Sequence, residues 1–303
     1  MSLALVSEEM SPGDADELAA LLERSLLLMR IRNTGALPLP DWMPTALNRQ
    51  IGRARTALDG VVRPRIAARR SATAANGGRE ESSGGDMLDG LLSVRHEGRA
   101  LTDEELEAEA KTLMSAGFET TAITFAWALW LLARYPEAQA RAREEASAVL
   151  CDDQPSLQDL ERLPFLQAVI DETLRLYPPV YNAARVAVRD DELGGHRVLK
   201  GGIVLVGIYA VQRHPDLWEE PDAFRPERFL NRNANKHPGF MPFLRGRHTC
   251  IGNSFAETEL LLALANIVRS WRFRPAVDGD VGVIPRMTLA PDRPIWLTAE
   301  AAG

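Results

Sequence analysis

Residues 243–252, Phe-Leu-Arg-Gly-Arg-His-Thr-Cys-Ile-Gly, form the stretch of the 303-residue chain that decides its fold. Cys250 stands between Gly246 and Gly252, directly before a run of residues with helical periodicity. A glycine-permitted turn and the positive end of a helix both present backbone N–H groups, which stabilise an anionic sulfur. A thiolate in that position can ligate haem iron. A small buried cysteine is the alternative, and other segments have to separate the two.

A second feature is an acid and a guanidinium three residues apart in a predicted helix over residues 164–177. Glu172 and Arg175 lie on one face of that helix because of the i, i+3 spacing. The segment FRPERF follows at residues 224–229 and adds Arg228. Taken alone, an exposed pair of this kind contributes only about 0–1 kcal/mol, so a solvated helix face is the alternative interpretation.

The third feature lies in a long helix that is predicted from Thr102 to Pro136, with Glu105 completing the helix-start pattern. Residues 116–121, Ala-Gly-Phe-Glu-Thr-Thr, put small and hydroxyl side chains into this otherwise apolar helix. A glycine inside a helix costs about 1 kcal/mol relative to alanine, so its presence needs a reason. Close approach of another group and a local bend caused by a threonine hydroxyl are two such reasons. Tight helix packing is the alternative.

Together these segments resemble the motifs of the cytochrome P450 family, in family order, and the resemblance covers roughly residues 14–298. It implies haem b as the cofactor, with Cys250 as the iron ligand. Most members have arginine where this chain has His248, which supplies one hydrogen bond to a propionate instead of a permanent charge and a two-pronged contact. The haem-site residues that the resemblance implies are Cys250, Phe243, Gly246, His248, Gly252, Arg185, Ala116 and Gly117.

The same resemblance assigns roles in catalysis and in structure. It implies that Glu119 and Thr120 deliver protons during oxygen activation, because O–O cleavage needs protons that a hydroxyl and an acid can relay. It implies a structural role for Glu172, Arg175 and Arg228, which hold the surroundings of the cysteine loop in place. The substrate contacts that it implies are Val180–Ala184, Phe118, Ala122 and Met287–Leu289.

Periodicity and turn residues along the chain predict a mainly α fold with a small β region, as a single domain over residues 1–303. Glycines and small polar residues predict a flexible loop at 71–86. β-branched residues between Arg185 and Val211 predict one small sheet, and the tail to Leu297 predicts terminal hairpins. The remaining helices are predicted over 14–32, 46–70, 136–150 and 250–271.

One expected family segment is missing from this sequence. No Trp-x-x-x-Arg segment precedes the first helices, although complete family members carry one on a helix that contacts haem. The chain therefore resembles the C-terminal two-thirds of the cytochrome P450 fold, lacking its N-terminal helices and strands.

Composition excludes several function classes. A net charge of −7 and a pI near 5.4 argue against a nucleic-acid partner. The two cysteines, Cys151 and Cys250, cannot form a dense disulfide framework, and no secretion signal opens the chain, so a cytoplasmic location is expected. The apolar run Thr121–Ala133 is too short to span a bilayer and predicts a buried helix.

Two functions remain open from the sequence. The first is a monooxygenase that inserts one oxygen atom of O2 into a small, apolar organic substrate. Its electrons would come from NAD(P)H through a separate ferredoxin- or flavodoxin-type donor with its reductase, because the chain has no flavin or iron–sulfur motif of its own. The second is a truncated, non-catalytic haem-binding remnant.

Overall fold

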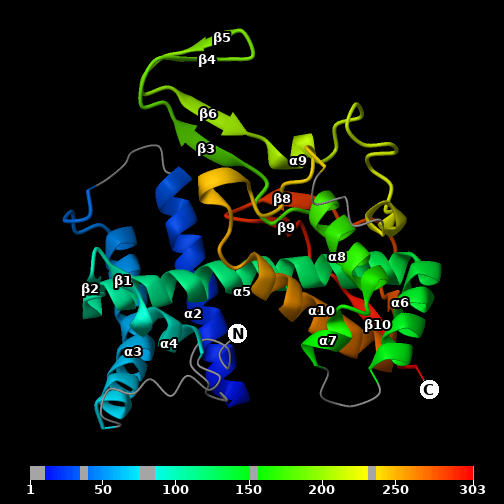
Figure 1. Cartoon of the computed structure of the whole chain (residues 1–303), viewed down its shortest axis with the longest axis horizontal. Helices are drawn as coiled ribbons and strands as arrows, with labels where there is room; N and C mark the ends of the chain where they lie inside the picture. Colours follow the sequence, from blue (N-terminus) through cyan, green and yellow to red (C-terminus); the bar gives the residue numbers. More distant parts are fainter. Residues whose placement is uncertain (1–10, 35–39, 76–85, 151–155, 231–236, 303) are drawn as a thin grey trace. The chain divides into compact units, whose positions relative to one another are not determined.

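The computed structural model describes residues 11–34, 40–75, 86–150, 156–230 and 237–302 (Figure 1). Cys151 lies outside these residues. The chain divides into two compact units, Met1–Glu119 and Thr120–Gly303, and the division falls inside one helix, α5 (Asp103–Arg134). A single domain over residues 1–303 stays a prediction.

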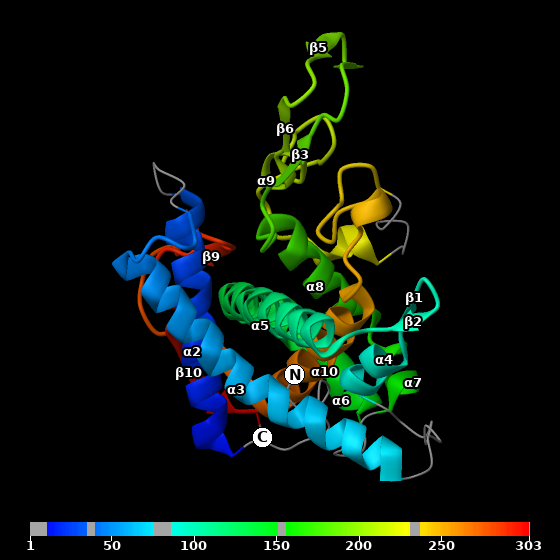
Figure 2. The ribbon, with the colours of Figure 1, turned by 90° about the vertical axis from the view of Figure 1, so that its left-hand side faces the viewer.

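The first unit is built mainly from helices that follow the predicted pattern. α2 (Pro12–Thr34) packs against α3 (Ala46–Ala75), as Figure 2 also shows. α4 (Met87–Ser93) and a short hairpin of β1 (Arg95–His96) and β2 (Arg99–Ala100) lead into α5. The buried core of this unit comprises Val62, Ile66, Leu88, Leu106, Ala110 and Met114.

The predicted flexible loop at 71–86 is wrong at both of its ends. α3 continues to Ala75, because the alanine-rich residues 71–75 favour a helix over a loop. At the other end Asp86 caps α4, and Arg69 of α3 donates hydrogen bonds of 2.7 Å to Asp86 and of 2.6 Å to Asp89. Residues 76–85 lie outside the described part of the chain.

The long helix α5 begins where the sequence predicts. The Glu105 N–H donates to the Thr102 hydroxyl at 3.2 Å, and the Glu105 carboxylate accepts from the Thr102 N–H at 2.9 Å, which is a capping box. α5 is long and apolar enough to cross a membrane by length and composition alone, a property that core helices of soluble proteins share. Trp127, Leu131 and Leu132 of the apolar run are buried within the second unit, while 39% of the most apolar window of α5 is buried in all.

The second unit has a core of packed helices. This core is formed by three helices, α6 (Pro136–Val149), α8 (Pro164–Leu176) and α10 (Asn253–Ser270) (Figure 1). The last turns of α5 and the short α7 (Leu157–Leu160) also contribute to it. Glu145 of α6 fixes the start of α8, since its carboxylate accepts the Phe165 and Leu166 N–H groups at 2.8 Å each. The central buried residues include Leu132, Ala142, Leu166, Ile170 and Leu264.

The β region differs from the prediction of one small sheet. β3 (Ala183–Val186) pairs with β6 (Ile203–Val206), whereas β4 (Asp191–Leu193) pairs only with β5 (His196–Val198). Within the described residues all five sheets have two antiparallel strands. Residues 208–211 form the short helix α9 (Ile208–Val211), not the predicted strand, because pairing ends at Val206 and Ile208 turns into the core.

The tail contains one of the predicted terminal hairpins and one further antiparallel pair whose two strands are not consecutive. β7 (Trp271–Pro275) pairs with β10 (Leu297–Ala301), and β8 (Val283–Pro285) pairs with β9 (Leu289–Pro291). The buried amide of Gln139 joins β7 to the helices. It accepts from the Phe273 N–H at 2.8 Å and donates at 2.9 Å to the carbonyl oxygens of both Phe273 and Leu132.

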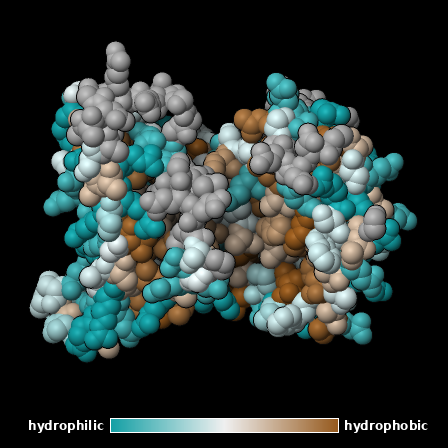
Figure 3. All heavy atoms as spheres, turned by 90° about the horizontal axis from the view of Figure 1, so that it is seen from below, coloured by the Kyte–Doolittle hydropathy of each residue, from teal (hydrophilic) through white to brown (hydrophobic). Residues whose placement is uncertain are grey.

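Some hydrophobic side chains are exposed on the surface of the molecule. Figure 3 shows hydrophobic residues, in brown, among hydrophilic residues in teal. The large exposed side chains include Trp42 in the first unit and Val188, Ile203 and Ile251 in the second. Scattered exposure of this kind is common in folded proteins and does not by itself mark a site.

Candidate functional site

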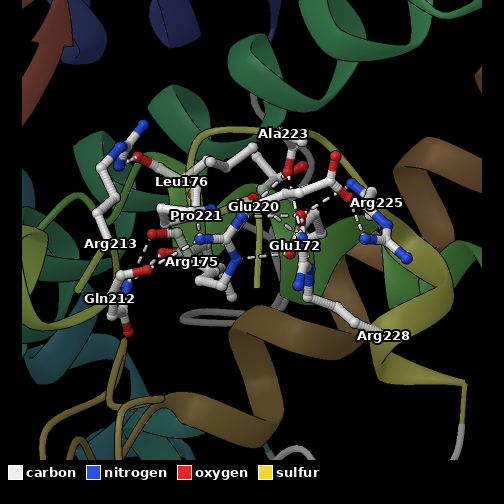
Figure 4. A network of polar contacts seen from close by, with 12 residues as sticks. Glu172, Arg175, Leu176, Gln212, Arg213, Glu220, Pro221, Ala223, Arg225 and Arg228 are labelled. Atoms are coloured by element: carbon white, nitrogen blue, oxygen red, sulfur yellow. Dashed lines mark hydrogen bonds and ion pairs between the residues drawn. The ribbon is translucent and has the colours of Figure 1, made fainter. Parts of the chain in front are cut away.

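The acid–arginine group predicted from the sequence is assembled and buried. The carboxylate of Glu172 accepts from Arg175 Nε at 2.7 Å and Nη2 at 2.9 Å, and from Arg228 Nε at 3.1 Å. Figure 4 shows Glu172 between the two arginines. Both Glu172 and Arg175 are 0% exposed, so the interpretation as a solvated helix face is wrong. A fourth donor, the Arg225 N–H, lies 2.8 Å from the same carboxylate.

The two arginines also hold the backbone between α9 and the short 3-10 helix η1 (Pro226–Phe229). Arg175 donates to the carbonyl oxygens of Gln212, Pro221 and Ala223, and Arg228 donates to those of Glu219 and Glu220. The Arg175 guanidinium also lies 5.0 Å above the ring of Trp218. The Arg175 bonds are buried or half-buried, whereas the two Arg228 bonds to Glu219 and Glu220 are exposed. Together they fix the path of a segment that has little regular structure of its own.

Gln212 connects this group to the cysteine loop, and no sequence pattern predicted this role. The side chain is 0% exposed. Its Nε2 donates to the carbonyl oxygens of Leu174 and Arg175 at 2.9 and 3.1 Å, and its Oε1 accepts from the Met241 N–H at 2.9 Å. Met241 stands two residues before Phe243, so the start of the loop is tied directly to the end of α8.

The cysteine loop is a tight backbone arrangement that ends at the start of α10. The Cys250 N–H donates to the Phe243 carbonyl oxygen at 2.9 Å, which closes the loop. Gly246 has a φ of +79°, in the left-handed region that favours glycine, and begins the 3-10 helix η3 (Gly246–His248). Gly252 is the N-cap residue of α10, and a Cβ atom added there would lie 3.9 Å from Cys250 Sγ. The thiol of Cys250 is free and exposed, which contradicts the alternative of a small buried cysteine.

The two loop glycines give a first prediction. Gly246→Ala is expected to destabilise the protein by about 1–2 kcal/mol, because an alanine at positive φ brings its Cβ atom close to the backbone. Gly252→Ala is the matched control, since Gly252 has a φ of −92° and space for a Cβ atom. Urea unfolding followed by circular dichroism measures both changes. Equal losses in the two variants would contradict the role assigned to the Gly246 conformation.

The other predicted site residues lie in several places. Arg185 is on β3, and His248 is in η3; both side chains are exposed. Ala116, Gly117 and Glu119 lie on α5 in the first unit.

Thr120 is the first residue of the second unit, also on α5. Its carbonyl oxygen accepts from the Thr124 hydroxyl at 2.9 Å. This contact is of the kind that a threonine hydroxyl makes inside a helix, but Thr124 lies outside the predicted segment 116–121.

The residues of the second unit fit the haem that the resemblance implies. Cys250 offers a free sulfur at the N-terminal end of a helix, where backbone N–H groups favour an anionic ligand. A Cβ atom at Gly252 would lie 3.9 Å from that sulfur, so the glycine keeps a side chain away from this side of it. Arg185 and His248 are exposed basic side chains of the kind that bind carboxylate groups such as propionates.

Comparison with known proteins identifies relatives over most of the chain. A family model described as "Cytochrome P450" matches residues 14–297. Cyclooctat-9-en-7-ol 5-monooxygenase of Streptomyces melanosporofaciens is 36% identical over 248 residues, which is 80% of this chain and 52% of the relative. Cytochrome P450 4F8 of Homo sapiens is 37% identical over 219 residues, or 70% of this chain and 42% of the relative.

Solved structures give the same result. The crystal structure of the cytochrome P450DA heme domain superposes with a TM-score of 0.85 and 28% identity, and the match covers 100% of this chain and 65% of that one. The chain thus spans about half the length of the two relatives named above and 65% of this solved chain.

Proposed function

This chain belongs to the cytochrome P450 family, and from that premise we propose that it is the haem-thiolate part of a monooxygenase. The proposed reaction inserts one oxygen atom of O2 into a small, apolar organic substrate. The observation that carries the proposal is the free, exposed Cys250 in a closed, glycine-flanked loop at the start of α10.

Haem b is the cofactor of this family, and when bound it supplies the redox chemistry that splits dioxygen. In the proposal Cys250 is the iron ligand. The Phe243 carbonyl oxygen accepts a hydrogen bond from the Cys250 N–H and thereby helps to position the sulfur. Gly246 and Gly252 are proposed to let the loop backbone come close to the cofactor. His248 and Arg185 bind the propionates, the first through one hydrogen bond and the second through its charge.

The residues proposed for proton delivery lie in sequence on α5. Glu119 holds a proton at its carboxyl group, and the Thr120 hydroxyl passes it toward the reacting oxygen. Ala116 and Gly117 precede them, and their small side chains keep this part of the helix narrow. Val180–Ala184, Phe118, Ala122 and Met287–Leu289 are proposed to contact the substrate.

Electrons are proposed to come from NAD(P)H through a separate ferredoxin- or flavodoxin-type protein and its reductase. The absence of a flavin or iron–sulfur motif in the sequence supports a separate donor. A cytoplasmic location is also proposed, because the two cysteines cannot form the dense disulfide framework of a small secreted protein.

Thr120→Ala tests the proposed role of the distal helix. The haem-loaded variant is expected to oxidise NAD(P)H with several-fold more of the reductant diverted to hydrogen peroxide, because the hydroxyl that relays protons is gone. The measurement is the ratio of peroxide formed to NAD(P)H consumed. The substrate in this measurement is chosen from a panel of small apolar compounds as the one that causes the largest shift of the ferric Soret band.

Thr112→Ala is the matched control. Thr112 is also on α5, is exposed, and donates its hydroxyl to the Ala108 carbonyl oxygen at 2.8 Å. Removing it leaves the proposed relay intact, so the peroxide ratio should stay at the level of the unsubstituted protein. A Thr120→Ala variant that couples reductant to product normally would show that protons arrive by another route.

A further inference from the structure

A groove of about 380 Å³ opens in the second unit between α7, α8, η1 and the first turns of α10. One part of its wall is apolar and includes Leu160, Leu261 and Phe229. Another part carries the acids Glu161, Asp171 and Glu257. None of the residues that the sequence analysis assigns to the haem site or to the acid–arginine group lines this groove.

Asp171 is the most buried acid in the wall. It is only 7% exposed, and its one hydrogen bond is the contact of its Oδ1 with Gln167 Nε2 at 3.2 Å. Its second oxygen therefore has no donor among the described residues. Burial raises the pKa of the Asp171 carboxyl to about 7, and the nearby Glu257 carboxylate adds to this effect.

Glu257 faces the same groove from α10 and has no hydrogen-bond donor among the residues that the structure describes. Burial raises the pKa of this carboxyl as well. The charged groups around the two carboxyls are Glu161 at the end of α7 and Glu172 on α8, and Glu172 is already bound to Arg175 and Arg228. No lysine, arginine or histidine stands among the groove's described lining residues. Within the part of the chain that the structure describes, Asp171 and Glu257 thus have no positively charged partner, and a ligand could supply one.

We propose that this groove binds a small organic cation with a guanidinium head and a short apolar stem. A guanidinium presents several N–H donors in one plane, which match the open oxygen of Asp171 and the carboxylate of Glu257. The stem would lie against Leu160, Leu261 and Phe229. Nothing in this proposal depends on haem or on the monooxygenase reaction.

Binding of a cation requires Asp171 to lose its proton, so affinity depends on pH. With a pKa of about 7 for Asp171, its ionised fraction rises about tenfold between about pH 6 and about pH 8. The affinity of the groove for the cation is expected to rise by the same factor.

The test is calorimetric titration of the full chain with n-butylguanidinium and, in parallel, with n-butylurea, a neutral analogue of nearly the same shape. The expected result is one saturable site for n-butylguanidinium, about tenfold tighter at about pH 8 than at about pH 6, and at least about tenfold weaker binding of n-butylurea. Asp171→Asn should weaken binding of the cation at least about tenfold and reduce the pH dependence, with the remainder coming from Glu257.

Two further variants complete the design. Glu257→Gln removes the second carboxylate from a half-buried position and decides the matter if Asp171→Asn fails to give a cooperative melt. Glu144→Gln, an exposed acid on α6 outside the groove, should bind like the unsubstituted protein. Equal affinity for the urea and the guanidinium, unchanged affinity in Glu257→Gln, or no saturable heat would each overturn the proposal.

Discussion

Cys250→Ser is expected to abolish the red-shifted Soret band that reduced, carbon monoxide-treated haem-thiolate proteins display. Serine places a hydroxyl where the structure has a free thiol, and a hydroxyl does not supply the anionic sulfur on which that band depends. The measurement is the absorbance difference between reduced protein with and without carbon monoxide. The expected loss of the band is complete.

Cys151→Ser is the control for this experiment, because the chain has only two cysteines. It should leave the band at the intensity of the unsubstituted protein at equal haem content. If Cys250→Ser kept the band, another ligand would hold the iron and the proposed site would be wrong.

Arg175→Met is expected to lower the free energy of unfolding by about 3–5 kcal/mol, because it removes one partner of a fully buried ion pair. The methionine would leave the Glu172 carboxylate with fewer donors. It would also leave the carbonyl oxygens of Gln212, Pro221 and Ala223 without the donors that Arg175 provides. Urea unfolding followed by circular dichroism measures the loss.

Arg197→Met is the matched control. Arg197 Nη2 lies 3.1 Å from Asp190 Oδ2, but the two side chains are 75% and 56% exposed. An exposed pair of this kind contributes about 0–1 kcal/mol, so this variant should unfold close to the unsubstituted protein. Similar losses in the two variants would mean that burial of the Arg175 pair has no special effect.

The sequence predicted the residues that carry a local pattern and missed those that act through tertiary contacts. Glu172 and Arg175 stand three residues apart on a predicted helix, so their pairing could be anticipated. Gln212 could not, because its partners Arg175 and Met241 lie 37 and 29 residues away and no spacing rule connects them. The bond from the Arg225 N–H to Glu172 was missed for the same reason.

Element types were predicted better than element ends and pairings. The helices at α6, α8 and α10 agree with the sequence to within a few residues, since Pro136 and Pro164 begin the first two and Gly252 precedes the third. The β-branched residues between Arg185 and Val211 predict short strands up to the end of this segment. Whether such a run stays paired depends on the partner strand, and here the partner stops opposite Val206.

The Gln139 amide has a consequence for the order in which the protein folds. Its partner Phe273 lies 134 residues further along the chain, whereas Leu132 is only 7 residues away. A ribosome delivers the N-terminal side first, so α5 and α6 leave it long before β7 exists. Until Phe273 has been synthesised, the amide can make one of its three backbone bonds and has to exchange the others with water. The second unit can therefore complete its core only after Phe273 has been synthesised. Until then its core is incomplete, so folding of this unit is slow and its unpaired surfaces can associate with other chains.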